Sequence, residues 1–313
     1  MIKNFDELMD EVDDYPVKTV AVAVAEKRCV VEAVKMAAEA GVARSILVGN
    51  AEKIEAIAGE LGFDTAGAEI IDEPNDLKAA RLATEAVKNG NADVLMKGHI
   101  HTDDFLRAIL DKETGLRTGS IMSHVFALET RDRDRLTFVT DGAMNIDPDL
   151  VTKASIIMNA VYLARCFGIH KPKVGVLAAV ELVNPKMPAT IDAAALSTME
   201  RRHQFPDCTV DGPFAMDNAI SPEAAEVKGL QGEVAGNCDI LVAPNIEAGN
   251  ILAKTYSFLS HGHTAGVVVG AAAPVVLTSR ADTPQARLHS LAIALLMANL
   301  HRDERLKIGK VHF

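Results

Sequence analysis

The stretch VVLTSRADT, residues 275–283, runs from apolar residues directly into a hydroxyl, a guanidinium and a carboxylate. Arg280 can hold an anion through two parallel hydrogen bonds. Ser279 can donate to an oxygen on which negative charge develops, and Asp282 can act as a general base. These three side chains therefore have the types and the spacing for a reaction on an anionic substrate.

Polar side chains also follow the other apolar runs, and ligands of open α/β sheets bind beyond the carboxyl ends of the strands. Lys97 follows DVLM directly. A cation there caps a helix N-terminus poorly, so Lys97 and Arg280 are expected either to bind a ligand or to form ion pairs, and the same two roles are expected for the carboxylate Asp211. Ordinary helix capping accounts better for a second group of polar residues, Thr102, Asp147 and Asp192.

The elements that must position these residues alternate between short β-branched runs and helical segments, which is typical of βα units and a parallel sheet. Three glycines follow helical patterns where a left-handed residue ends a helix: Gly41, Gly62 and Gly90. The expected strands lie at 19–25, 45–49, 93–96, 136–140, 173–180, 239–243, 266–271 and 274–279.

The length of 313 residues exceeds the usual size of one hydrophobic core and predicts two α/β domains. The segment 148–167 is apolar over most of its circumference, so we expect a buried helix there and place the boundary just before it. The helix expected at 284–301 begins with proline and is placed with the first domain. The predicted domains are 1–147 plus 284–313, and 148–283.

The composition excludes several classes of partner. The net charge is −11 and no cluster of Lys and Arg forms a basic patch, so nucleic acid is not expected. Four cysteines lie far apart and are expected to be reduced. The N-terminus lacks the apolar run of a signal peptide and no segment has the length of a membrane span, so we expect a cytoplasmic protein without membrane contact.

Other chemical motifs are incomplete. His99 and His101 have the spacing of two metal ligands, but no third ligand follows at a recognisable distance, so no metal is expected. Asp211 and Asp217 favour a cap and a turn over a magnesium site. The glycine-rich nucleotide motifs and the G-x-S-x-G elbow are absent from the sequence.

Several of these loops together resemble the phosphate acetyl/butyryl transferase family, and its butyryltransferase branch more than its long acetyl-specific members. The similar stretches are LMKGHIHTDDFLRAIL, TDGAMNIDPDL, VNPKMPATIDAAALS, VDGPFAMDNAIS, PNIEAGNILAK and VVLTSRAD, spread over about residues 18 to 300.

This resemblance implies the reaction acyl-CoA + phosphate ⇌ acyl phosphate + CoA, with coenzyme A and phosphate as substrates and no bound cofactor. It implies a two-domain fold like that of isocitrate and isopropylmalate dehydrogenases, with the site in the interdomain cleft. It also implies a homo-oligomer, at least a dimer.

Under the resemblance, Ser279 stabilises the oxyanion, Arg280 binds phosphate, and Asp282 takes the thiol proton of coenzyme A. The acetyl branch places its proposed base several residues further on, where 283–286 contain no acid. Either Asp282 serves through a shorter loop, or positioning of the two substrates does most of the work. The expected substrate-binding residues are Lys97, Asn145, Asn184, Lys186 and Asn245.

Two alternatives remain open at this point. A metal- and NAD-dependent decarboxylating dehydrogenase needs a carboxylate triad and an arginine cluster, and neither is visible in the sequence. A non-catalytic sensor of acyl-CoA or acyl phosphate needs only the binding loops. Direct attack by the sulfur of coenzyme A requires no covalent acyl-enzyme, which disfavours Cys208 and Cys238 as nucleophiles.

Overall fold

The computed structural model describes residues 1–130, 133–279, 281–300 and 311–312. They form two compact units, which we name for the helices α11 (Pro284–Leu300) and α6 (Leu150–Cys166). As far as each is described, the α11 unit comprises Phe5–Ser120 and Ala265–Arg302, and the α6 unit comprises Met1–Asn4, Ile121–Thr264 and Asp303–Phe313. These boundaries lie elsewhere than 1–147 plus 284–313 and 148–283, and that domain division stays a prediction.

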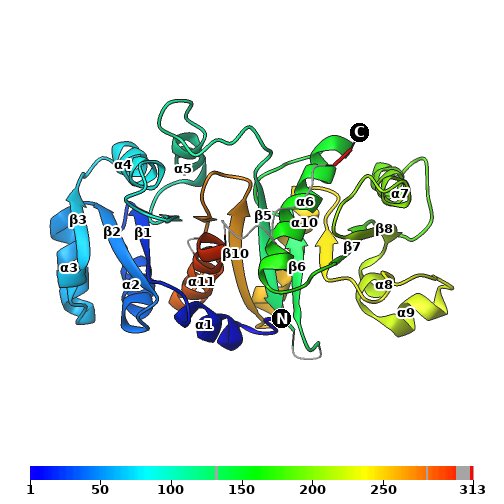
Figure 1. Ribbon diagram of the computed structural model, residues 1–313, viewed down its shortest axis with the longest axis horizontal. Coiled ribbons are helices and arrows are strands. Elements are labelled where there is room, and N and C mark those ends of the chain that lie inside the picture. The colour runs from blue at the N-terminus through cyan, green and yellow to red at the C-terminus, as the bar shows by residue number, and fades with distance from the viewer. Residues whose placement is uncertain (131–132, 280, 301–310, 313) are drawn as a thin grey trace. The chain divides into compact units, whose positions relative to one another are not determined.

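The α11 unit is a sheet with helices packed against it (Figure 1). Its strands follow the order β3-β2-β1-β4-β11-β10, parallel from β3 to β11. The elements are α1 (Phe5–Asp13), β1 (Lys18–Ala23), α2 (Arg28–Glu39), β2 (Ala43–Gly49), α3 (Ala51–Leu61), η1 (Thr65–Gly67), β3 (Ala68–Asp72), α4 (Asp76–Lys88), β4 (Val94–Lys97), α5 (Thr102–Ile109), β10 (His263–Val269), β11 (Val275–Val276) and α11.

Local sequence signals set the ends of several helices in this unit. The side chain of Asn50 accepts a hydrogen bond from the Lys53 N–H at the start of α3, and Asn75 does the same at the start of α4. The prediction of left-handed glycines is confirmed, since Gly41, Gly62 and Gly90 have φ values of 74°, 62° and 79°.

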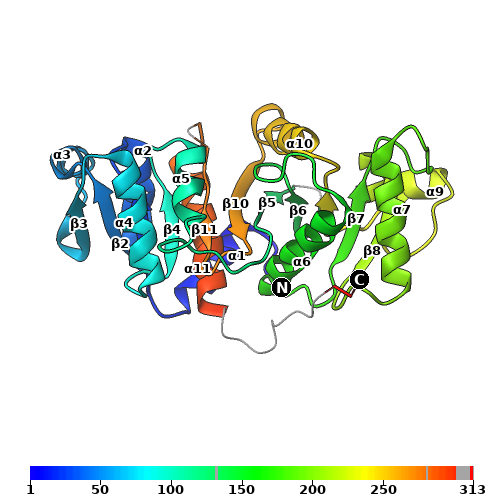
Figure 2. The same cartoon turned by 90° about the horizontal axis from the view of Figure 1, so that it is seen from above.

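Helix α11 is the core element of its unit. Every residue from Arg287 to Met297 is buried, so the helix is enclosed around its whole circumference. It packs against α1 and α2, while α4 packs with α5, as Figure 2 shows. Burial of one leucine side chain such as Leu291 or Leu295 contributes about 1.5–3 kcal/mol to stability.

The strands of the α6 unit follow the order β5-β6-β9-β7-β8. The strands from β6 to β8 are parallel, and their helices include α6, which contacts β5, β6, β9 and α7. The elements are β5 (Ser123–Glu129), β6 (Leu136–Thr140), α6, β7 (Lys173–Leu177), α7 (Pro188–Arg201), β8 (Thr209–Phe214), α8 (Met216–Ile220), α9 (Pro222–Val227), β9 (Ile240–Val242) and α10 (Ile246–Leu259).

The expectation of parallel strands throughout is wrong at two places. β5 runs antiparallel to β6, and β10 runs antiparallel to β11. Only residues 130–135 connect β5 to β6, and only residues 270–274 connect β10 to β11. A parallel connection needs a crossover of about a dozen residues or more, so links this short force the chain to turn back. Each unit therefore contains both parallel and antiparallel strand pairs.

Candidate functional site

The ends of β4 and β11 bring two predicted site residues to one edge of the α11 unit's sheet. The strands pair in parallel, with Val276 opposite Met96, so both chains leave the sheet on the same side. Lys97 is the last residue of β4 and is only 2% exposed. Ser279 follows β11 by three residues and is half-buried.

A close approach of the backbone packs this edge tightly. The Gly98 N–H donates to the Ala23 carbonyl at 2.9 Å, and a Cβ added to Gly98 would lie 2.1 Å from the carbonyl oxygen of Val24. Only glycine fits there. The residue after Lys97 is therefore fixed against the end of β1, which holds the lysine backbone in place.

Two hydrogen bonds join Ser279 and Asp282. The carboxylate Oδ2 of Asp282 accepts the Ser279 N–H at 2.6 Å, and the Asp282 N–H donates to the Ser279 carbonyl at 3.2 Å. The Ala281 N–H also points to the Ser279 hydroxyl, at 3.4 Å. The structure thus brings Ser279 and Asp282 together. Arg280, the third predicted catalytic residue, lies outside the described residues.

Arg287 is a further residue at this edge, and the sequence reasoning missed it. Its guanidinium, on the first turns of α11, is 2% exposed and reaches back to the strand end. Nη2 donates to the Ser279 carbonyl at 2.6 Å, and Nη1 donates to the Thr278 hydroxyl. An arginine among the apolar residues of α11 was the available signal, because such a burial needs hydrogen-bond partners.

The ends of β6 and β9 form a comparable edge in the α6 unit. Asp141, directly after β6, is 3% exposed, and its carboxylate accepts N–H groups of Ala143, Met144 and Asn145. The Asn145 side-chain amide donates to Asp141 at 2.6 Å and to the Met122 carbonyl at 2.9 Å. Asn145, which was predicted to bind substrate, is therefore held in place by hydrogen bonds of its side chain.

The start of α10 packs against the same loop. Asn245 caps α10 by accepting the Ala248 N–H at 3.0 Å. One turn on, the Asn250 amide donates to the Gly142 carbonyl at 2.9 Å. The Ile246 N–H donates to the Ile146 carbonyl at 2.9 Å, so the predicted residues Asn145 and Asn245 lie on neighbouring segments.

The two predicted residues after β7 lie in an exposed turn. The Asn184 side chain accepts the Lys186 N–H at 2.9 Å, and the Asn184 N–H donates to Thr190 of α7 at 2.9 Å. Both Asn184 and Lys186 are exposed. No ion pair of the Lys186 ammonium occurs with any residue in the described ranges.

An ionic cluster that the sequence did not predict lies beyond β7 and β8. Lys228 contacts Glu181 at 3.3 Å and Asp217 at 3.2 Å, and the buried Asn218 amide donates to Glu181. Backbone N–H groups and Lys228 lower the pKa of both carboxyls, and the two carboxylates raise the pKa of Lys228. This cluster joins two strand ends, and its side chains are partly exposed, so each pair contributes little to stability.

The described residues contain no group of three or more potential ligands that could hold a metal ion. Asp211 accepts hydrogen bonds from Ser197 and from the Gly212 N–H. Burial raises the pKa of Cys208 and Cys238 to about 12, which is opposite to what a nucleophilic thiol requires. No helix in the described part of the chain is long and apolar enough to span a membrane.

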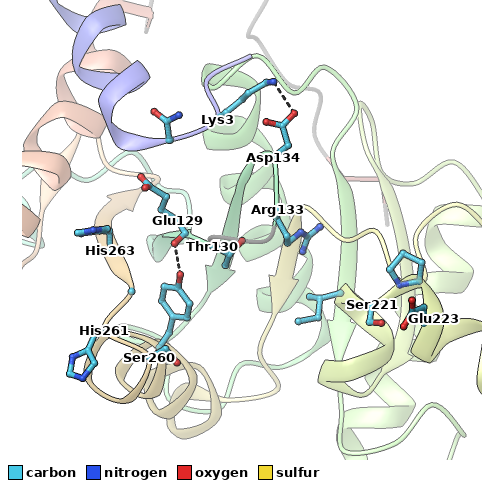
Figure 3. A pocket seen from close by; sticks show the side chains of 15 residues that line it. Lys3, Glu129, Thr130, Arg133, Asp134, Ser221, Glu223, Ser260, His261 and His263 are labelled. Carbon is cyan, nitrogen blue, oxygen red and sulfur yellow. Dashed lines mark hydrogen bonds and ion pairs between the residues drawn. The ribbon is translucent and has the colours of Figure 1, made fainter.

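A cavity lies at the other edge of the α6 unit's sheet (Figure 3). Glu129 ends β5, which is antiparallel to β6, so the cavity is next to the start of β6 and away from Asn145. Lys3 pairs with Asp134 at its rim at 2.8 Å. None of the predicted site residues that the structure describes lines it. Its labelled lining residues are Lys3, Glu129, Thr130, Arg133, Asp134, Ser221, Glu223, Ser260, His261 and His263.

Comparison with known protein families gives a match over residues 73–295, to the family described as phosphate acetyl/butaryl transferase. The chain belongs to this family. A phosphate butyryltransferase from Clostridium acetobutylicum is 50% identical over 298 residues, which cover 95% of this chain and 99% of the relative. A phosphate acetyltransferase from Rhizobium meliloti is 45% identical, over 85% of this chain and 84% of the relative.

Solved structures agree with the membership in the phosphate acetyl/butyryl transferase family. A branched-chain phosphotransacylase from Enterococcus faecalis V583 has a TM-score of 0.79 and 32% identity, and covers 90% of this chain and 99% of its own. The resemblance predicted from the sequence is thereby confirmed. The alternatives of a decarboxylating dehydrogenase and of a non-catalytic sensor are not supported by these relatives.

The expected likeness to isocitrate and isopropylmalate dehydrogenases is wrong. The structures that match well are phosphotransacylases. A 4-hydroxythreonine-4-phosphate dehydrogenase from Salmonella typhimurium is only distantly similar, with a TM-score of 0.55 and 14% identity. A rhythm of α and β elements defines the α/β class, but strand order and direction decide the fold, and two antiparallel pairs escaped the sequence reading.

Proposed function

We propose that this chain is a phosphate butyryltransferase, which interconverts butyryl-CoA plus phosphate with butyryl phosphate plus coenzyme A. The observation that carries the proposal is the 50% identity to a phosphate butyryltransferase over nearly the full length of both chains. The geometry supports the proposal, because Lys97 and Ser279 lie at the same edge of the sheet. A cation that binds an anion and a hydroxyl that donates to it suit phosphate transfer.

The chemistry is a single displacement within a complex of both substrates. The thiolate sulfur of coenzyme A forms a bond to the carbonyl carbon of the acyl phosphate, and the bond from that carbon to the phosphate oxygen breaks. The carbonyl oxygen carries the negative charge in between, and free phosphate leaves. In the reverse direction a phosphate oxygen attacks the thioester and the thiolate leaves.

The residues at the β4 and β11 edge are assigned the chemical roles. Ser279 donates its hydroxyl to the developing oxyanion. Arg280 and Lys97 neutralise the phosphate, which an arginine does through two parallel hydrogen bonds and a lysine as a point charge. Asp282 takes the proton of the thiol, since only the thiolate attacks well and a free thiol is mostly protonated at neutral pH.

The neutral amides and the exposed lysine of the α6 unit are assigned to substrate binding. They are Asn145, Asn184, Lys186 and Asn245. Coenzyme A and phosphate act as substrates, and no bound cofactor is needed for the displacement. A homo-oligomer and a cytoplasmic location stay predictions from the sequence.

The test is phosphorolysis of acetyl-, propionyl- and butyryl-CoA side by side, with thiol release followed and kcat/KM compared. The expected order places butyryl-CoA first. A higher kcat/KM for acetyl-CoA would overturn the acyl assignment but keep the reaction. Absence of turnover with all three substrates would overturn the reaction itself.

An arginine pair provides the matched control for the site. Arg280→Ala is expected to lower kcat/KM for phosphate by about 100-fold or more, because a charge-assisted contact is lost. Arg107→Ala should change little, since Arg107 is 74% exposed and its one ion pair within the described ranges is with Asp104 of its own helix. Equal effects of the two substitutions would contradict the role of Arg280.

A further inference from the structure

We propose that Arg287 is a positioning residue, which holds the end of β11 so that Ser279 faces the reacting groups. This inference rests on the proposed function, because it concerns the same strand end. Arg287 does not replace Ser279 or Arg280 in the chemistry. It acts through the Ser279 backbone.

The first support is the geometry of its two donors. Nη2 binds the Ser279 carbonyl at 2.6 Å and Nη1 binds the Thr278 hydroxyl, so one planar group fixes two consecutive residues. A guanidinium offers its donors in a rigid fork, and holding both acceptors at once restricts rotation of the peptide that joins them. The direction of the Ser279 side chain follows from that peptide.

The second support is the closure of the loop between the strand and the helix. Thr283 caps α11 by accepting the Ala286 N–H at 3.1 Å, and its carbonyl accepts the Arg287 N–H at 3.1 Å. The backbone of Arg287 thus anchors the helix start while its side chain anchors the strand end. The hydrogen bond from the Ser279 N–H to Asp282 adds a further link between the strand end and the residues before α11.

The third support is electrostatic. Arg287 is 2% exposed, and no carboxylate in the described part of the chain forms an ion pair with it. Its Nε has no hydrogen-bond partner among these residues either. A buried cation with no counter-ion among the described residues gains little stability, and an apolar side chain of similar size would pack there at less cost. Stability alone therefore does not account for an arginine at this position.

The test compares four variants by steady-state kinetics of butyryl-CoA phosphorolysis and by thermal unfolding. Arg287→Lys keeps the charge but loses the fork, and Thr278→Val removes one acceptor without changing the shape of the side chain. Thr278→Ser keeps the hydroxyl that Thr278→Val removes. Ser290→Ala is the control on the same helix, because the Ser290 hydroxyl accepts the Gly266 N–H at 3.0 Å and does not contact Ser279.

We expect Arg287→Lys and Thr278→Val to lower kcat by about 10- to 100-fold, with KM for both substrates within a few-fold of the wild type, since misplacement of a reacting group costs rate rather than binding. Thr278→Ser should recover most of the rate. Ser290→Ala should lower Tm but keep kcat at temperatures where it is folded.

Two results would overturn the inference. One is full kcat in folded Arg287→Lys and Thr278→Val. The other is a loss of kcat in Ser290→Ala as large as theirs, which would show a general effect of helix stability. If Arg287→Lys does not fold, the Thr278 pair decides alone. Wild-type protein without any turnover would instead overturn the proposed function, so the two failures are distinguishable.

Discussion

Polar residues follow the strand ends at two sheet edges of this protein, and the two edges differ in the sign of the charge that they bury. The edge of β4 and β11 buries two cations, Lys97 and Arg287, each 2% exposed. The edge of β6 and β9 buries Asp141, whose carboxylate is taken up by N–H groups of its own loop. One edge concentrates positive charge near a hydroxyl, and the other uses its charge to shape a loop.

This difference in buried charge suggests that the β4 and β11 edge takes part in the reaction and that the β6 and β9 edge has a structural role. Cations in a low-dielectric edge attract an anionic substrate more strongly than exposed ones, because water screens them less. A carboxylate saturated by backbone donors has little left to offer a ligand. We therefore expect substitutions at the β4 and β11 edge to change the rate, and substitutions at the β6 and β9 edge to change mainly stability or KM.

The largest effect within this comparison is expected at Asp282. Asp282→Asn keeps an oxygen that can accept the Ser279 N–H but removes the base, so kcat should fall by about 100-fold at neutral pH. The Tm should stay near that of the wild type. A near-normal kcat for Asp282→Asn together with a lowered kcat for Asp282→Ala would show that Asp282 only accepts the Ser279 N–H and is not the base.

The next effect compares Lys97, at the β4 and β11 edge, with Lys186, in the exposed turn after β7. Lys97→Met should lower kcat/KM for phosphate by about 10- to 100-fold, the equivalent of one lost hydrogen bond to a charged group. Lys186→Met should change it by a few-fold at most, since Lys186 is exposed. Phosphate saturation curves of both variants check this, and a larger loss for Lys186→Met would break the comparison.

A smaller effect is expected at Asn245. Asn245→Ala removes the cap of α10 and should cost about 1 kcal/mol of unfolding free energy in urea titration. Asn245→Ser keeps a capping oxygen and should regain that stability. If Asn245 also binds substrate, the raised KM will persist in Asn245→Ser, whereas a KM restored along with stability would leave it as a cap only.

The smallest effect concerns pH and the Lys228 cluster. The pKa values of Glu181 and Asp217 are lowered in the folded protein, so their contribution is present above about pH 4 and is lost as the pH falls through the folded pKa values. The pKa of Lys228 is raised, so its contribution is lost only at high pH.

The difference in Tm between wild type and Lys228→Met should therefore be present near pH 7 and shrink below about pH 4. Thermal unfolding over this range measures it. A difference that stays constant down to pH 2 would mean that Lys228 acts through packing and not through charge.

The sequence predicted the fold best where a residue type has a specific conformational preference, such as a glycine with positive φ at the end of a helix. Gly62 ends α3 where the pattern placed it, and the helix expected at 284–301 is found as α11, Pro284–Leu300. The strands β3 and β8 were missed because they lie at the ends of their strand orders and are only partly buried, so neither shows a continuous apolar run.

The site was less accessible to sequence reasoning. Ser279 and Asp282 are close in the chain, and their hydrogen bond follows from a short turn. Arg287 reaches the same turn from a helix, and which way a helical side chain points depends on packing that the sequence does not display. The link between Lys228, Glu181 and Asp217 likewise depends on the order in which strands pair.

The most direct test of the account is the rate of butyryl-CoA phosphorolysis by the wild type and by Ser279→Ala, with Ser155→Ala on α6 as the control. We expect phosphate-dependent thiol release by the wild type, and a kcat lower by about 100-fold or more for Ser279→Ala, with KM little changed. Ser155→Ala should match the wild type, because its hydroxyl donates to the Val151 carbonyl of its own helix. Wild-type kcat in folded Ser279→Ala would contradict the claim that the reaction takes place at the end of β11.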